Sequence, residues 1–119
     1  MIIKLINYIK ELIPEATYGQ IQDSPDNLIN INIYIPDMNM YFNDTSTQNF
    51  IINLYIRNSK FEELMKINEN ISQKLVNSYD KNIGNLHLVN TKKTNEREVQ
   101  RDNKNRYSQS SSFKMTIEY

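Results

Sequence analysis

A change of hydrophobic period in the middle of the chain places the strongest limit on its fold. In residues 50–57, FIINLYIR, apolar side chains alternate as in a strand with one buried face, whereas residues 60–79 repeat them at steps of three and four. Ser59 is followed by Glu62 and Glu63, which matches a capping box and predicts that a helix begins there. A strand that leads into one long helix favours a sheet with that helix packed across it.

The segments on either side of this unit predict the remaining elements. Apolar residues in 2–13 form one stripe, which predicts an N-terminal amphipathic helix that ends at Pro14. Isoleucines alternate with polar residues in LININIYI, so residues 28–57 are expected to form a pair of strands joined as a hairpin. A short edge strand is possible within 16–21. Two C-terminal strands are expected at about 86–91 and 107–119.

These elements predict one domain over residues 1–119. Its class is α+β, with a mixed, mostly antiparallel sheet of about four to five strands, one long helix across the sheet and the N-terminal helix. Between the last two strands, residues 92–106 contain six basic and three acidic residues and almost nothing apolar. The sequence predicts a long loop there, and loops of that length usually carry a function or lack order.

The residues needed for common enzyme and cofactor chemistry are missing or isolated. The chain has no cysteine, which excludes disulfides, thiolate catalysis and cysteine-ligated zinc. Gly19 and Gly84 stand alone, so there is no phosphate-binding loop or dinucleotide motif. His87 is the single histidine, and no nucleophile motif accompanies it. We therefore expect no catalytic residue, no metal, no cofactor and no enzymatic activity.

Charge gives little support for a nucleic-acid or membrane partner. The 14 basic and 14 acidic residues cancel, so no overall field attracts an anionic partner. The basic 92–106 segment, followed by Tyr107, is a local exception, but the strands lack the alternation of aromatic and basic residues typical of single-strand binders. Lys4 and Asn7 interrupt the apolar N-terminus, which predicts neither a membrane span nor a signal peptide. The protein is expected to be cytosolic where it is made.

Residues 37–49 are expected to form the tip of the hairpin. They contain methionine and aromatic residues before the polar turn NDTSTQN. Exposed side chains of this kind would provide an adaptable apolar contact surface for a partner. The candidates are Met38, Met40 and Phe42.

The order of elements, with NLYIRNSKFEELMKINENISQKL in the middle and RDNKNRYSQSSSFKMTIEY at the end, resembles the tail-terminator (tail-completion, minor capsid) proteins of long-tailed bacteriophages. The resemblance covers most of the chain. Its most specific part is Arg101, Asp102 and Arg106 ahead of a hydroxyl-rich run and a final strand. Relatives often have a glycine in the turn between the Asp and the Arg, where this chain has Asn103, Lys104 and Asn105; asparagine also tolerates left-handed conformations.

The resemblance implies a ring, typically a hexamer, that caps the tail tube, ends its polymerisation and joins it to the head. The implied partners are other copies of the chain, the tail tube protein, neck or connector proteins and, in a contractile tail, the sheath protein. DNA would only pass through the channel, and no membrane is involved. The implied location is the tail or neck of the virion, after synthesis in the bacterial host's cytoplasm. Candidate subunit or tube contacts are Arg97, Arg101, Asp102, Lys104, Arg106, Met38, Met40 and Phe42.

Two other classes of function remain open. A small α+β binding module of the immunity or antitoxin type would neutralise a single protein partner, and a stable monomer would favour it. A small nuclease that uses carboxylates and His87 is the third possibility, and it would lose activity in a His87→Ala variant.

Overall fold

The computed structural model describes residues 2–35 and 47–118, which form two helices and one seven-stranded sheet. The N-terminal half contains α1 (Ile2–Leu12), β1 (Thr17–Tyr18), β2 (Leu28–Tyr34) and β3 (Thr47–Asn58). The C-terminal half contains α2 (Phe61–Val76), β4 (Lys81–Ile83), β5 (Leu86–Glu96), β6 (Gln100–Arg101) and β7 (Tyr107–Glu118). The predicted hairpin contacts Met38, Met40 and Phe42 lie outside the described residues.

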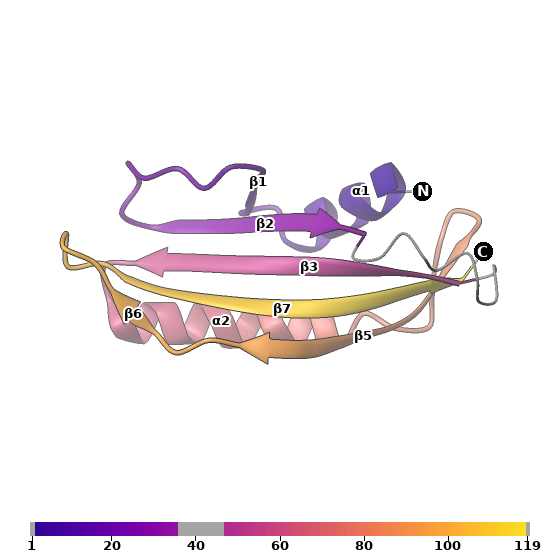
Figure 1. The fold of residues 1–119 in the computed structure, drawn as a ribbon. Helices are drawn as coiled ribbons and strands as arrows, with labels where there is room; N and C mark the ends of the chain where they lie inside the picture. Colours follow the sequence, from indigo (N-terminus) through magenta and orange to yellow (C-terminus); the bar gives the residue numbers. More distant parts are fainter. Residues whose placement is uncertain (1, 36–46, 119) are drawn as a thin grey trace.

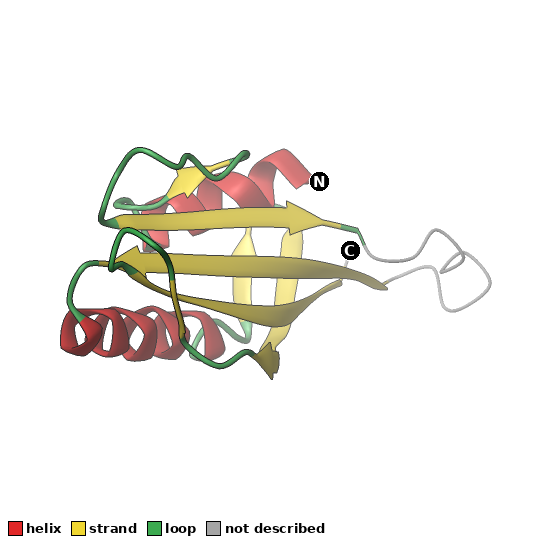
Figure 2. Ribbon diagram, turned by 60° about the vertical axis from the view of Figure 1, so that its left-hand side comes forward, coloured by secondary structure: helices red, strands yellow, loops and turns green. Residues whose placement is uncertain are grey.

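The strands form one curled sheet in the order β1-β2-β3-β7-β5-β4, and β6 pairs with β7. Every pairing is antiparallel except that of β1 with β2. Both helices cover the same face (Figures 1 and 2). The other face is open except near Arg57, where the β1–β2 connection covers it. The predicted α+β class and mostly antiparallel sheet are confirmed. The predicted number of strands is too low, because the short strands β4 and β6 add to the sheet.

The core forms between the covered face of the sheet and the two helices. The alternation predicted for β3 is confirmed, since Phe50, Ile52, Leu54 and Ile56 are each at most 1% exposed. Burial of one such side chain stabilises the fold by about 1.5–3 kcal/mol. The other residues of the core at this level of burial are Leu5, Ile9 and Ile13 near α1, Ile31 of β2, Leu64, Ile71 and Leu75 of α2, Leu88 of β5, and Phe113, Met115 and Ile117 of β7.

The predicted capping box at the start of α2 is wrong. The N-cap residue is Lys60, which makes no capping hydrogen bond through its side chain. Asn58 Oδ1 accepts a hydrogen bond from the Lys60 N–H at 2.9 Å, and the Ser59 N–H donates to Asn27 Oδ1 at 3.1 Å. Ser59 is therefore tied to the segment before β2, and the preceding asparagine orders the chain where it leaves β3.

α2 also ends at Val76, earlier than the predicted residue 79. Ser78 is fully buried, and its carbonyl accepts a hydrogen bond from Thr91 Oγ1 of β5 at 2.9 Å. Its hydroxyl accepts a hydrogen bond from Tyr8 of α1 at 3.0 Å. These contacts turn the chain toward β4, so Tyr79 is 56% exposed and does not continue the buried stripe.

The long loop predicted at 92–106 is replaced by paired strands. β5 continues through this polar sequence to Glu96, and β6 forms at Gln100–Arg101. Both strands pair with β7, and β5 has register irregularities between Leu88 and Asn90 and between Lys93 and Asn95. The backbone ladder, rather than apolar side chains, orders this segment. Residues 97–99 between β5 and β6, and the turn between β6 and β7, remain outside a strand.

Gly84 in the β4–β5 turn requires a backbone conformation that disfavours other residues. Its φ is +62°, and an added Cβ would lie 3.4 Å from Lys4 Nζ. We expect Gly84→Ala to lower the free energy of unfolding by about 1 kcal/mol, measured by urea denaturation. Gly19→Ala is the matched variant for the backbone effect alone. The φ of Gly19 is also positive, at +97°, but no atom lies within 4 Å of the added Cβ. Unchanged stability in Gly84→Ala would contradict the expectation.

Candidate functional site

The structure separates the predicted contact residues that it describes into two groups. Arg97 lies beside the open face of the sheet, directly after β5. The other four lie in β6 and in the turn that joins it to β7, at one end of the sheet. They are Arg101, Asp102, Lys104 and Arg106. Arg101 points to its own neighbours, with its Nη2 3.0 Å from Asn105 Oδ1 and its guanidinium carbon 5.6 Å from the Tyr107 ring centre.

Arg106 makes an internal contact network at this turn. Its side chain is only 4% exposed. Its Nε donates to Asp102 Oδ2 at 2.8 Å, its Nη1 donates to the Asp23 carbonyl at 2.6 Å, and its Nη2 donates to Asp23 Oδ1 at 3.1 Å. Lys104 Nζ also reaches Asp23, at 3.0 Å from Oδ2. We call Asp23, Arg57, Asp102, Lys104 and Arg106 the arginine cluster.

Arg57 of β3 completes the cluster and is not predicted as a site residue by the sequence. It is 3% exposed, and its guanidinium donates to the carbonyls of Gln22, at 2.7 Å, and Pro25, at 3.0 Å. Arg106 Nη1 reaches the same Pro25 carbonyl at 3.3 Å. The two arginines therefore fasten the β1–β2 connection to the ends of β3 and β7. The only sequence signal is an arginine within the apolar run of a strand.

Hydrogen bonds favour the charged forms of Asp23, Asp102 and Arg106. Those from Lys104 and Arg106 lower the pKa of Asp23 below its usual range. The pKa of Asp102 is also lowered, mainly by the hydrogen bond from the Arg106 backbone N–H. The hydrogen bond to Asp102 in turn raises the pKa of Arg106. Because these charges are satisfied within the chain, reversing Arg106 would disturb the monomer itself. The roles predicted for these residues in subunit contacts stay predictions.

The lowered pKa values give the cluster a defined pH dependence. A carboxylate with a lowered folded-state pKa stabilises the fold above its unfolded pKa, and this contribution is lost as pH falls through the folded value. We expect Asp23→Asn to lower the urea midpoint at pH 7 and to reduce the loss of stability between about pH 5 and pH 2. Asp26→Asn is the control, because Asp26 also faces Arg106 but at a longer distance, 3.9 Å between Asp26 Oδ1 and Arg106 Nη1. Equal acid sensitivity of the wild type and Asp23→Asn would refute this.

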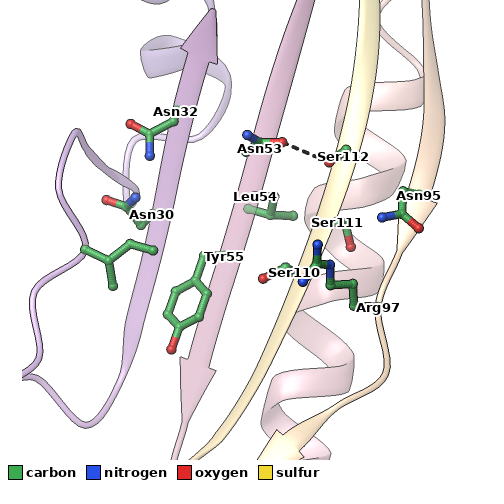
Figure 3. Close-up of a pocket in the computed structure, with 11 residues that line it drawn as sticks. Asn30, Asn32, Asn53, Leu54, Tyr55, Asn95, Arg97, Ser110, Ser111 and Ser112 are labelled. Carbon is green, nitrogen blue, oxygen red and sulfur yellow. Dashed lines mark hydrogen bonds between the residues drawn. The ribbon is translucent and has the colours of Figure 1, made fainter.

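The open face of the sheet is lined by small polar side chains (Figure 3). They alternate along β3 and β7 with buried residues such as Leu54 and Phe113, so they point away from the helices. A shallow hollow of about 280 Å³ lies over the middle strands, and a second of about 80 Å³ adjoins it toward the β6 end. Their open-face lining includes Asn30, Asn32, Asn53, Tyr55, Asn95, Arg97, Ser108, Ser110 and Ser112.

Hydrogen bonds between strands hold part of this surface in place. Ser112 Oγ donates to Asn53 Oδ1 at 2.8 Å, and Thr116 Oγ1 donates to Asn49 Oδ1 at 2.8 Å. Tyr55 stands on one side of the β7 serines and Arg97 on the other (Figure 3). The result is a polar groove along β7, with hydroxyl groups on its floor. We call this surface the serine groove.

The described residues contain no group of three or more His, Cys, Asp or Glu side chains placed to hold a metal ion. His87 contacts Asp80 Oδ1 through Nε2 at 3.2 Å and Asn82 Oδ1 through Nδ1 at 3.0 Å. Both contacts lie in the β4–β5 hairpin region. In the parts of the chain that the structure describes, neither helix has the length and apolarity needed to cross a membrane.

Comparison with known proteins gives a match among solved structures. No family model matches the chain, and no curated protein sequence does so significantly. Among solved structures, the chain is similar to one in a structure described as the virion of a native gene transfer agent particle, with a TM-score of 0.65 and 14% sequence identity. The alignment covers 93% of this chain and 84% of the other. At this identity the match establishes a shared fold.

Proposed function

We propose that the protein is a structural component of a phage, or of a phage-like particle, and acts in its tail. The observation that carries the proposal is the fold shared with a chain of a gene transfer agent virion over 93% of this protein. The resemblance of the middle and C-terminal sequence to tail terminators supports the same assignment. The protein would form a ring that caps the tail tube, ends its polymerisation and joins the tail to the head or neck.

Several features of the described residues suit an assembly role. The polar serine groove lies on one face, and the two helices lie on the other. A subunit of a ring uses two different surfaces for its two neighbours, so distinct faces are what a heterologous contact requires. The proposed partners are other copies of the chain, the tail tube protein and neck proteins, and the proposed location is the tail or neck of the virion. We propose no enzymatic activity.

The test is co-sedimentation of the purified protein with tail tubes assembled from the tube protein of the same particle. Negative-stain electron microscopy then examines the tube ends. We expect a ring at one end of each tube and, when the protein is present during assembly, tubes of limited length. Tubes without the protein should continue to grow.

Bare tube ends and a protein that stays in the supernatant would refute the capping function. Stable 1:1 binding to one small protein would instead favour the immunity or antitoxin class. A fold-preserving variant with weakened self-contact, described next, separates failure to form a ring from failure to bind the tube.

A further inference from the structure

We propose that the serine groove of one copy binds the outer face of α2 from the next copy. This inference names the subunit contact of the proposed ring, and it therefore rests in part on the proposed function. The contact is heterologous, since a groove on one copy meets a helix on another. The shape of the groove, the unpaired charges on the two surfaces and the spacing of those charges support this contact.

The groove has room for a helix because its floor is made of short side chains. Ser108, Ser110 and Ser112 follow one another on the open face of β7. Tyr55 and Arg97 are longer and stand on either side of that row (Figure 3). The hollows over these residues join along β7, so the depression follows the direction of the strand.

The open face also carries cations without partners in the described residues. Lys92, Arg97 and Lys114 form no ion pair there. Lys92 and Lys114 are direct cross-strand partners, an arrangement that repels unless an anion lies nearby. Along the groove, acidic side chains occur only toward its ends, at Glu98 and Glu118, among the residues that the structure describes. The middle of the face therefore favours an acidic partner.

The outer face of α2 supplies acids of this kind. Leu64, Ile71 and Leu75 face the core, so the opposite stripe of the helix is exposed. Glu62 and Glu69 lie on this exposed stripe and form no ion pair in the described part of the chain. The remaining members of the stripe are Met65, which is 41% exposed, Lys66 and Gln73.

The spacing of the two sets of charges matches. Glu62 and Glu69 are seven residues apart, or about 10.5 Å along a helix. The Arg97 N–H donates to the Ser110 carbonyl, and Lys92 pairs with Lys114, so the cations are separated by about four residues of β7, or about 13 Å. A helix parallel to β7 would place one glutamate near each end and Met65 over the serines.

The two surfaces cannot meet within one molecule, because α2 packs on the opposite side of the sheet (Figure 2). Any contact between them must join two copies. Each copy would then use its groove for one neighbour and its helix for the other, and repetition closes a ring if the rotation permits. Exposed ion pairs contribute little individually, so isolated copies are expected to associate weakly.

Thiol cross-linking tests this contact directly, since the chain has no cysteine of its own. We would mix the Ser110→Cys protein with the Met65→Cys protein, treat the mixture with a short thiol cross-linker and repeat this on tube ends. The expected product is the mixed dimer, in excess over both homodimers. The matched control replaces Met65→Cys by Glu11→Cys, an exposed position on α1. Mixed dimers no more abundant than in the control would overturn the proposal.

Charge variants supply a second readout and preserve the core. Arg97→Glu should weaken cross-linking by about three- to tenfold, and a single reversal in the partner, of whichever of Glu62 and Glu69 meets Arg97, to Arg should restore it. Lys81→Glu, an exposed change on β4, should have no effect. If rings still cap tubes while Arg97→Glu changes nothing, the subunit contact lies elsewhere and only this proposal fails. Loss of binding to a short DNA duplex, with cross-linking unchanged, would assign the face to nucleic acid and overturn the proposal.

Discussion

Phe113→Ala is expected to lower the free energy of unfolding by about 3–5 kcal/mol, a large share of the 5–15 kcal/mol typical of a domain. Phe113 is fully buried on β7, the strand between β3 and β5. Its neighbours are Ile52 in register on β3 and Lys93 on β5, whose ammonium lies 5.8 Å from the ring centre. Truncation would leave a cavity where the sheet has neighbours on both sides.

The measurement is urea denaturation followed by circular dichroism. Phe113→Leu is the matched control, because it retains much of the buried volume, and it should cost clearly less than the alanine variant. A loss below about 1 kcal/mol in Phe113→Ala would show that the site collapses around the smaller residue or that the ring is not packed as described.

Asn68→Ala is expected to cost about 1–3 kcal/mol, because it removes the donor of a buried hydrogen-bond network. Asn68 is 6% exposed in the middle of α2, and its Nδ2 donates to Glu96 Oε1 and Gln109 Oε1, both at 2.9 Å. Gln109 in turn donates to the Arg97 carbonyl at 2.9 Å. Without the Asn68 amide, the Gln109 oxygen loses a partner and the end of β5 loses one of its side-chain attachments to the helix.

Hydrogen exchange measures the local part of this effect, at the amides of residues 94–98, and urea denaturation measures the global part. Asn70→Ala on the exposed side of the same helix controls for the change in helix propensity, which favours alanine. If Asn68→Ala and Asn70→Ala have the same stability, the buried network contributes nothing to the fold.

The elements that the sequence predicts correctly have one apolar face. Phe50 and Ile52 repeat at a period of two, and Leu64 and Ile71 repeat at helical spacing, so side-chain burial alone identifies their elements. The end of β5 has no such signal. Residues 92–96 are polar throughout, and backbone pairing with β7 holds them in the sheet. The pattern of side chains in the sequence does not reveal such backbone pairing.

The candidate site shows the same limit. Arg106 appears in the sequence as one more charge of a basic segment, and its burial depends on Asp23, which is 83 residues away in the chain. Arg97 is exposed and forms no ion pair in the described residues, and its predicted role in contacts stays a prediction. The serine groove itself depends on which strands become neighbours. The row of serines acquires its two sides only when β3 and β5 flank β7.

The place of β7 in the middle of the sheet also has a kinetic consequence. All twelve residues of β7 pair with β3, and the partners lie on the order of 50 to 70 residues apart in the chain. The β4–β5 hairpin and α2 need only local contacts, so they can form early. Joining β3 to β7 requires closure of a long loop, so we expect this step to limit the rate of folding. Until then both strands expose unpaired edges, and the refolding yield should fall with increasing protein concentration.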